Sequence, residues 1–286
     1  MKQITVISGK GGTGKTVVTG SLAALVKNKV MADCDVDAAD LHLLLHPEIK
    51  ERHKFKGSKT AVIDEEKCTL CSRCIEVCRF GAISKNQSTV LIDPLSCEGC
   101  SACQLVCPEG AIELKEEITG EWFISTTKYG MMVHAKLEIA QENSGKLVSV
   151  VREKARDIAV EEKLDYVIID GPPGIGCPVI ASLSGIDIAL VVTEPTLSGI
   201  HDLERIIGVC QHFGVKVYVC INKFDLSISN SQKIEEYCKS TGIQAPVKIP
   251  YEEKVIKSVV KGIPYVEYSS DEIKKRIWQL WQNIQT

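Results

Sequence analysis

The sequence predicts an α/β fold with a mainly parallel, twisted sheet, helices on both faces of the sheet, and a small insert. Three observations support this prediction. Short apolar runs rich in β-branched residues alternate with longer stretches that carry helical apolar spacing. A glycine-rich loop joins the first strand-like run to the first helix-like run. In the middle of the chain, cysteines form two runs with identical spacing.

Length and composition limit the possible classes of protein. At 286 residues the chain can form one large α/β domain, or a medium-sized domain with a small one. The net charge of −3 offers no basic tail for nucleic acid and no polybasic membrane patch. The sequence has no apolar run of about 18 residues, and the start MKQITVIS is unlike a signal peptide. We therefore expect a cytoplasmic protein with no membrane span and no nucleic acid partner.

The first loop carries a phosphate-binding pattern. A strand is expected at residues 4–7 and a helix at 17–26, and the sequence between them fits G-x-x-x-x-G-K-[ST]. Glycines let the backbone coil so that N–H groups point at an anion, and the helix N-terminus adds to that field. Lys15 can reach the terminal phosphates, and the Thr16 hydroxyl suits Mg²⁺. The expected nucleotide-binding residues of this loop are Gly9, Lys10, Gly11, Gly12, Thr13, Gly14, Lys15 and Thr16.

Lys10 makes the prediction more specific. A second lysine directly after the first glycine of the pattern resembles the deviant Walker A motif of the MinD/ParA/nitrogenase-iron-protein ATPases. This resemblance implies a P-loop ATPase that binds ATP and Mg²⁺ between two subunits, with Lys10 reaching across to the partner's nucleotide. Lys10 and Lys15 would then both be catalytic. The partner subunit would be a second copy or a similar ATPase.

A second short strand is expected at residues 29–33 and leads into Asp35 and Asp37. Carboxylates at the carboxyl end of a parallel strand lie where open α/β sheets bind ligands. The segment resembles switch I of the family, which implies that Asp35 orients the attacking water and lies near Mg²⁺. An acidic turn that caps a helix at 41–45 is the alternative, and we prefer it for Asp37 and Asp40.

A cysteine repeat follows the charged stretch 48–59, which is predicted to be irregular. The run Cys-x2-Cys-x2-Cys-x3-Cys occurs twice, 29 residues apart. This is the spacing of bacterial-type ferredoxins, in which the fourth cysteine of each run ligates the other cluster. A zinc ribbon would instead separate C-x2-C pairs by longer spacers. We assign one [4Fe–4S] cluster to Cys68, Cys71, Cys74 and Cys107, and the other to Cys78, Cys97, Cys100 and Cys103.

The α/β pattern resumes near residue 121. Strands are expected at 122–126, 131–137, 166–170, 188–193, 216–221 and 247–251, and helices at 144–163 and 198–213. Asp170 ends a wholly apolar strand and precedes Gly-Pro-Pro-Gly, which resembles the Walker B strand and switch II. The resemblance implies that Asp170 holds Mg²⁺ through water. Trp278 and Trp281 in the last helix are expected to pack in the core.

The base-binding region is expected around Asn222 and Pro250. By resemblance to the family, Asn222 contacts the base, and Pro250 follows the last strand, whose end lines the base pocket. However, Asn222 begins an Asn-Lys-x-Asp sequence, the pattern by which GTPases bind guanine through the aspartate, here Asp225. The surrounding motifs favour adenine, and guanine stays open as the alternative.

Five cysteines lie outside the repeat. Free cysteines are usually small buried hydrophobes, and we expect this of Cys210, Cys220 and Cys238. Cys177 lies seven residues after Asp170, where the nitrogenase iron protein has a ligand of its subunit-bridging cluster. The second ligand of that cluster would fall at residues 143–146, where this chain has no cysteine, so a bridging cluster is not favoured.

Together the motifs divide the chain into an ATPase domain at 1–57 and 120–286 and an inserted α+β ferredoxin-like domain at 58–119. Two functions are consistent with this organisation. The first is ATP-gated electron transfer through both clusters to a redox partner protein, which the complete double motif favours. The second is a maturation factor that assembles iron–sulfur clusters or a metal, or carries them to an acceptor protein. A MinD-type positioning ATPase is disfavoured, because residues 274–286 lack a clear membrane-targeting face.

Overall fold

The computed structural model describes residues 1–138, 144–269 and 272–285. The described chain divides into two compact units. The larger unit contains Met1–His53, Trp122–Leu137 and the described residues from Ser144 onward, and the smaller unit contains Lys54–Glu121 together with Glu138. The limits 58 and 119 expected from the sequence fall inside the smaller unit.

Within the described residues, nine strands form one sheet in the order β11-β10-β9-β1-β8-β2-β7-β6-β3. The strands from β11 to β7 in this order all pair in parallel. A turn of two residues joins β6 to its neighbour β7, so these two strands run antiparallel. The strands are β1 (Lys2–Ser8), β2 (Lys29–Asp33), β3 (Glu48–Ile63), β6 (Ile112–Thr127), β7 (Gly130–Leu137), β8 (Tyr166–Pro173), β9 (Ile188–Thr193), β10 (Lys216–Asn222) and β11 (Val247–Ile249).

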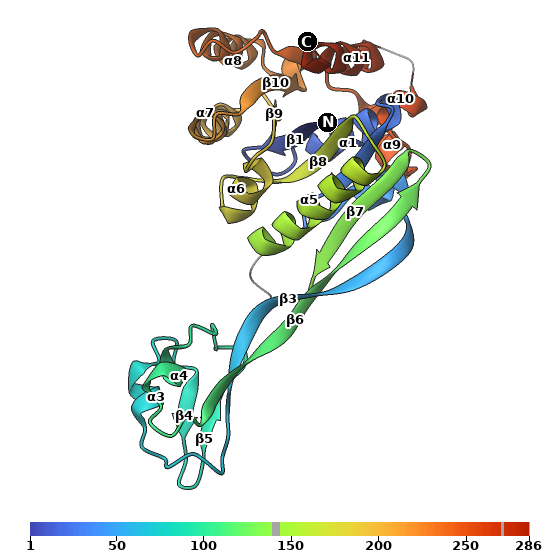
Figure 1. Cartoon of the computed structure of the whole chain (residues 1–286). Helices are drawn as coiled ribbons and strands as arrows, with labels where there is room; N and C mark the ends of the chain where they lie inside the picture. The colour runs from blue at the N-terminus through green and yellow to red at the C-terminus, as the bar shows by residue number, and fades with distance from the viewer. Residues whose placement is uncertain (139–143, 270–271, 286) are drawn as a thin grey trace. The chain divides into compact units, whose positions relative to one another are not determined.

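Helices cover both faces of the central strands (Figure 1). All residues of β2 and β9 are buried, as expected of parallel strands covered on two sides. On one face, Ile4 and Val6 of β1 share a core with α1, α2, α10 and α11. On the other face, Thr5 donates a hydrogen bond to Ser182 of α6. The helices are α1 (Lys15–Leu25), α2 (Leu41–Leu45), α5 (Ser144–Glu161), α6 (Cys177–Leu183), α7 (Leu197–His212), the 3-10 turn η1 (Phe224–Leu226), α8 (Ile228–Ser240), α9 (Glu253–Val260), α10 (Tyr265–Tyr268) and α11 (Glu272–Gln285).

The α/β fold with a mainly parallel sheet and helices on both faces, predicted from the sequence, is confirmed. None of the helices in the described part of the chain is both long enough and apolar enough to cross a membrane. Cys210, Cys220 and Cys238 are fully buried, as expected of small hydrophobic side chains.

The smaller unit contains two short helices and a two-stranded antiparallel sheet. Helices α3 (Arg73–Val77) and α4 (Ala102–Val106) contact each other, and β4 (Ile83–Lys85) pairs with β5 (Val90–Ile92). Its core joins a few aliphatic residues to six cysteines of the repeat, whereas Cys71 and Cys100 are exposed. A core this small buries little apolar area.

Three expectations from the sequence were wrong. Residues 48–59 are not irregular but belong to β3. The first residues of this strand, Glu48–Arg52, are all exposed, so they lack the alternation of a half-buried strand. Trp278 is 46% exposed, whereas Trp281 is 3% exposed, because only Trp281 falls on the buried stripe of α11. Asp40 precedes α2 at the N-cap position, but its side chain makes no capping hydrogen bond.

Candidate functional site

The loop between β1 and α1 follows the backbone course that its glycines allow. Gly12 and Gly14 have φ angles of 78° and 90°, in the left-handed region that favours glycine. A Cβ on Gly14 would also lie 2.3 Å from the Asn222 side-chain nitrogen, so a larger residue there would force the Asn222 side chain to move. The loop borders a cavity of about 370 Å³ that Asp35 and Pro173 also line.

Four predicted site residues converge beside this loop. Nζ of Lys15 lies 3.1 Å from Oδ2 of Asp35 and 3.1 Å from Oδ1 of Asp170. The Thr16 hydroxyl donates to Oδ2 of Asp170 at 2.9 Å, and the Thr19 hydroxyl donates to Oδ1 at 2.7 Å. Hydroxyl and carboxylate oxygens are the ligands that Mg²⁺ prefers, so Thr16, Asp35 and Asp170 could hold that ion.

Asp33 belongs to the same cluster and was missed by the sequence analysis. It pairs in register with Asp170 across β2 and β8 and is 1% exposed. Its Oδ1 accepts the Asp35 N–H, and its Oδ2 has no hydrogen-bond partner among the described residues. Burial and the neighbouring Asp170 raise the pKa of Asp33 well above its ordinary value, against the effect of Lys15. Its position as the last residue of a buried strand was the signal available in the sequence.

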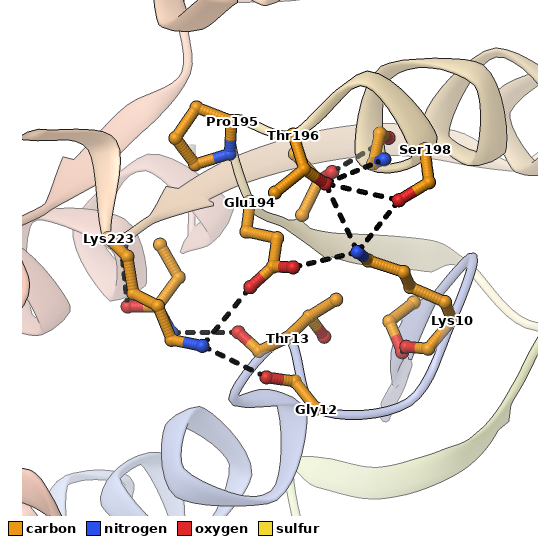
Figure 2. Close-up of polar contacts among 12 residues, drawn as sticks. Lys10, Gly12, Thr13, Glu194, Pro195, Thr196, Ser198 and Lys223 are labelled. Carbon is orange, nitrogen blue, oxygen red and sulfur yellow. Dashed lines mark hydrogen bonds and ion pairs between the residues drawn. The ribbon is translucent and has the colours of Figure 1, made fainter. Parts of the chain in front are cut away.

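Lys10 lies on the other side of the loop, in contact with the segment that follows β9 (Figure 2). Its Nζ is 2.7 Å from Oε1 of Glu194, 3.1 Å from the Thr196 hydroxyl and 3.0 Å from the Ser198 hydroxyl. Oε2 of Glu194 lies 3.1 Å from Nζ of Lys223. Glu194 was not predicted as a site residue, although it follows the buried strand β9 as Asp35 follows β2.

The Asn-Lys-x-Asp segment contacts both the loop and the end of β11. The Asn222 amide donates to the Thr13 carbonyl at 2.7 Å, and Lys223 donates to the Gly12 carbonyl at 3.1 Å. Oδ1 of Asp225 accepts the Tyr251 N–H at 2.7 Å, directly after Pro250. The structure therefore brings Asn222 to the phosphate-binding loop and ties Asp225 to the segment that follows β11.

The eight cysteines of the repeat line two separate cavities in the smaller unit. Pairs of N–H and thiol groups lie close there, with Ala61 N at 3.5 Å from the Cys97 sulfur and Ala111 N at 3.3 Å from the Cys107 sulfur. Among the described residues, no group of three or more Cys, His, Asp or Glu side chains is arranged to hold a metal ion. One cavity is lined by Cys68, Cys71, Cys74 and Cys107, and the other by Cys78, Cys97, Cys100 and Cys103.

Cys177 begins α6 and is exposed. A Cβ on Gly145 would lie 3.6 Å from the Cys177 Cβ, so these two positions are neighbours. This neighbour falls in the segment 143–146, where the second ligand of a bridging cluster would be expected. Residue 143 itself lies outside the described residues.

Residues 4–265 match the family model described as the CobQ/CobB/MinD/ParA nucleotide binding domain. The chain belongs to this family. An uncharacterized protein of Methanocaldococcus jannaschii is 36% identical over 226 residues, which cover 77% of this chain and 78% of the relative. An iron-sulfur cluster carrier protein of the same organism is 27% identical over 157 residues, covering 49% of this chain and 53% of that protein.

The fold is also similar to that of a solved family member. The septum site-determining protein MinD of Pyrococcus horikoshii, in complex with Mg-ADP, has a TM-score of 0.56 at 17% identity. The match covers 99% of this chain and 95% of that protein. The MinD/ParA type of nucleotide-binding fold, first indicated by Lys10 and the glycine loop, is thus confirmed.

Proposed function

We propose that the protein is a dimeric ATPase that couples ATP binding and hydrolysis to electron transfer through two [4Fe–4S] clusters. The observation that carries this proposal is the presence of two sets of residues in one chain. One set, Lys15, Thr16, Asp35 and Asp170, converges beside a phosphate-binding loop. The other set is the pair of cysteine quartets, each of which lines its own cavity.

ATP is the proposed nucleotide, with Mg²⁺ held by Thr16, Asp35 and Asp170. The Mg-ADP complex of the P. horikoshii protein supports this choice. Bound Mg²⁺ would neutralise phosphate charge. Lys15 contributes a positive charge at the terminal phosphates, and Asp35 orients the attacking water by accepting its hydrogen bond. Lys10 completes the site of the partner subunit, which is a second copy or a similar ATPase.

Each cysteine quartet fits one [4Fe–4S] cluster, because each combines three cysteines of one run with the fourth of the other run. The spacing argues against a zinc ribbon, in which longer spacers separate the C-x2-C pairs. Such clusters supply one-electron reduction at low potential. The sulfurs of Cys97 and Cys107 would be stabilised as thiolates by the nearby Ala61 and Ala111 N–H groups.

Metal analysis tests the cluster assignment directly. Protein purified without oxygen should carry about eight iron and eight sulfide per chain. Cys78→Ser and Cys107→Ser should each lose the cluster of a different quartet and keep about four iron. Cys177→Ser is the matched control, because Cys177 is exposed and lies outside both quartets. Zinc in place of iron, or four iron in the unmodified protein, would contradict the assignment.

A redox titration with and without ATP·Mg²⁺ tests the coupling. The potential of at least one cluster should change on nucleotide binding, and cluster reduction should change nucleotide affinity by the same free energy, about 1–3 kcal/mol. Lys10→Ala should abolish this change while keeping both clusters. The alternative is a cluster carrier, for which the resemblance to the M. jannaschii carrier protein is the supporting observation. Equal potentials, together with ATP-dependent transfer of iron to an acceptor that lacks its cluster, would favour the carrier.

A further inference from the structure

The ammonium group of Lys10 has all its hydrogen-bond donors engaged within its own chain (Figure 2). A lysine ammonium has three N–H donors. In this structure it has three oxygen partners at 2.7–3.1 Å, from Glu194, Thr196 and Ser198. Lys10 must leave all three partners before it can contact anything outside this subunit.

The surroundings of this group make Glu194 the partner that matters most. The Thr196 side chain accepts the Gly199 N–H and caps the N-terminus of α7. A helix N-terminus carries a partial positive charge and repels a lysine placed beside it. Among the three partners of Lys10, only Glu194 has a negative charge to offset that repulsion. Burial alone would raise the pKa of Glu194, but hydrogen bonds from Lys10 and Lys223 hold it below its ordinary value.

Glu194 also links Lys10 to a third segment of the chain. Its second oxygen lies 3.1 Å from Nζ of Lys223, which in turn donates to the Gly12 carbonyl at 3.1 Å. One carboxylate therefore ties the phosphate-binding loop, the start of α7 and the end of β10 together (Figure 2). A phosphate group bound in the loop would compete with this carboxylate for the positive charge of the lysines.

We propose that Glu194 is a positioning residue that holds Lys10 in its own subunit while no nucleotide is bound, and that releases it when nucleotide binds. Binding of anionic phosphates beside Gly12 weakens the contacts of Glu194 with Lys10 and Lys223. Lys10 then becomes available to a second subunit. The role in hydrolysis rests on the proposed function. The contact of Lys10 with Glu194 in the absence of nucleotide does not.

Acylation of lysines by an amine-reactive ester, followed by mass spectrometry, measures this contact without any activity assay. In nucleotide-free protein, Glu194→Gln should make Lys10 react about tenfold faster, because a charge-assisted hydrogen bond is lost and the helix repulsion stays. Ser198→Ala removes a neutral partner and should change the rate by less than about threefold. Lys15 is the internal control: it is 6% exposed, it is paired with Asp35 and Asp170, and it should stay unreactive in every variant.

Steady-state kinetics tests whether the contact restrains catalysis. Glu194→Gln should lower the ATP concentration at half-maximal rate by about tenfold and leave kcat within about threefold, since less energy is needed to free Lys10. In a Lys10→Ala background, where hydrolysis is expected to be lost, equilibrium binding of ATP is measured instead. Glu194→Gln should then change ATP affinity much less than it does with Lys10 present, which a merely structural role of Glu194 would not predict. An unchanged Lys10 acylation rate in Glu194→Gln, with Lys15 still protected, would overturn the proposal. Absence of ATP hydrolysis in the unmodified protein would overturn the proposed function instead, and the acylation result would still decide the contact.

Discussion

Replacing Lys15 by alanine should destabilise the nucleotide-free protein as well as weaken nucleotide binding. Lys15 is 6% exposed, and its Nζ lies 3.1 Å from carboxylate oxygens of Asp35 and Asp170. The fully buried Asp33 is also close enough for its charge to act on Lys15. The variant therefore leaves three carboxyl groups close together with no cation among them.

The size of the effect follows from this arrangement. Removing one partner of a buried ion pair costs about 3–5 kcal/mol, since the remaining charge stays without compensation. For a domain of 150–250 residues, this corresponds to a decrease in Tm of roughly 6–20 °C. Lowering the pH from 7 to 5 should reduce the difference between variant and parent. The carboxyls of Asp33 and Asp35 already have raised pKa values from burial, and protonation removes the charge that Lys15 offsets.

Differential scanning calorimetry without nucleotide measures the effect, and Mg²⁺ adds a second readout. Mg²⁺ should restore more stability to Lys15→Ala than to the parent, because the ion replaces the missing positive charge among the carboxylates. Lys27→Ala is the matched control: Lys27 is exposed, and its loss should change Tm by less than about 2 °C. A Tm for Lys15→Ala within 2 °C of the parent at pH 7 would refute the reasoning that Lys15 compensates this cluster.

Three further outcomes are expected. Asp35→Ala should keep ATP binding within a few-fold but abolish hydrolysis, and hydrolysis at the parental rate would show that switch I is misplaced. Competition binding should favour ATP over GTP, since one oxygen of Asp225 already accepts the Tyr251 N–H. Guanine recognition by Asp225 would instead give a preference for GTP of about 10²-fold or more, and that result would contradict the adenine assignment. Burial, with His42 nearby, lowers the pKa of His134 to about 4, so the unfolded chain binds the proton first as pH falls below 6.5. Urea titrations should show that His134 lowers the free energy of unfolding by about 2 kcal/mol between pH 7 and pH 5. His134→Gln should remove that part of the pH dependence.

The elements that the sequence predicted well are those whose signal is local. Strands β8 and β9 contain continuous apolar runs because both of their faces are covered, and their positions follow from composition alone. The glycine loop has a fixed spacing because its backbone conformation needs glycine at particular positions, such as Gly12 and Gly14. The cysteine repeat is likewise a local pattern, and the two cavities that its members line correspond to the two quartets assigned from spacing.

What the sequence did not predict depends on distant parts of the chain or on exposed strands. Lys10 and Glu194 are 184 residues apart, and no local pattern indicates that they meet. Asp33 joins the cluster only because β2 and β8 pair in register. The first half of β3 carries charged residues on both faces, so its sequence has no apolar periodicity to detect. The strand lies next to β6, and the ion pair of Lys56 with Glu116 joins the two strands.

Three lysines beside the phosphate-binding loop are each paired with a carboxylate. Lys15 contacts Asp35 and Asp170, and Glu194 contacts both Lys10 and Lys223. A ligand can shift a conformational equilibrium only if it binds one state better than the other. A phosphate group can bind these lysines only when the carboxylates release them. The ion pairs therefore make the affinity for phosphate differ between the paired and the released state. Asp35 and Glu194 lie at the starts of two different connections, after β2 and after β9, and a single bound nucleotide therefore acts on both segments at once.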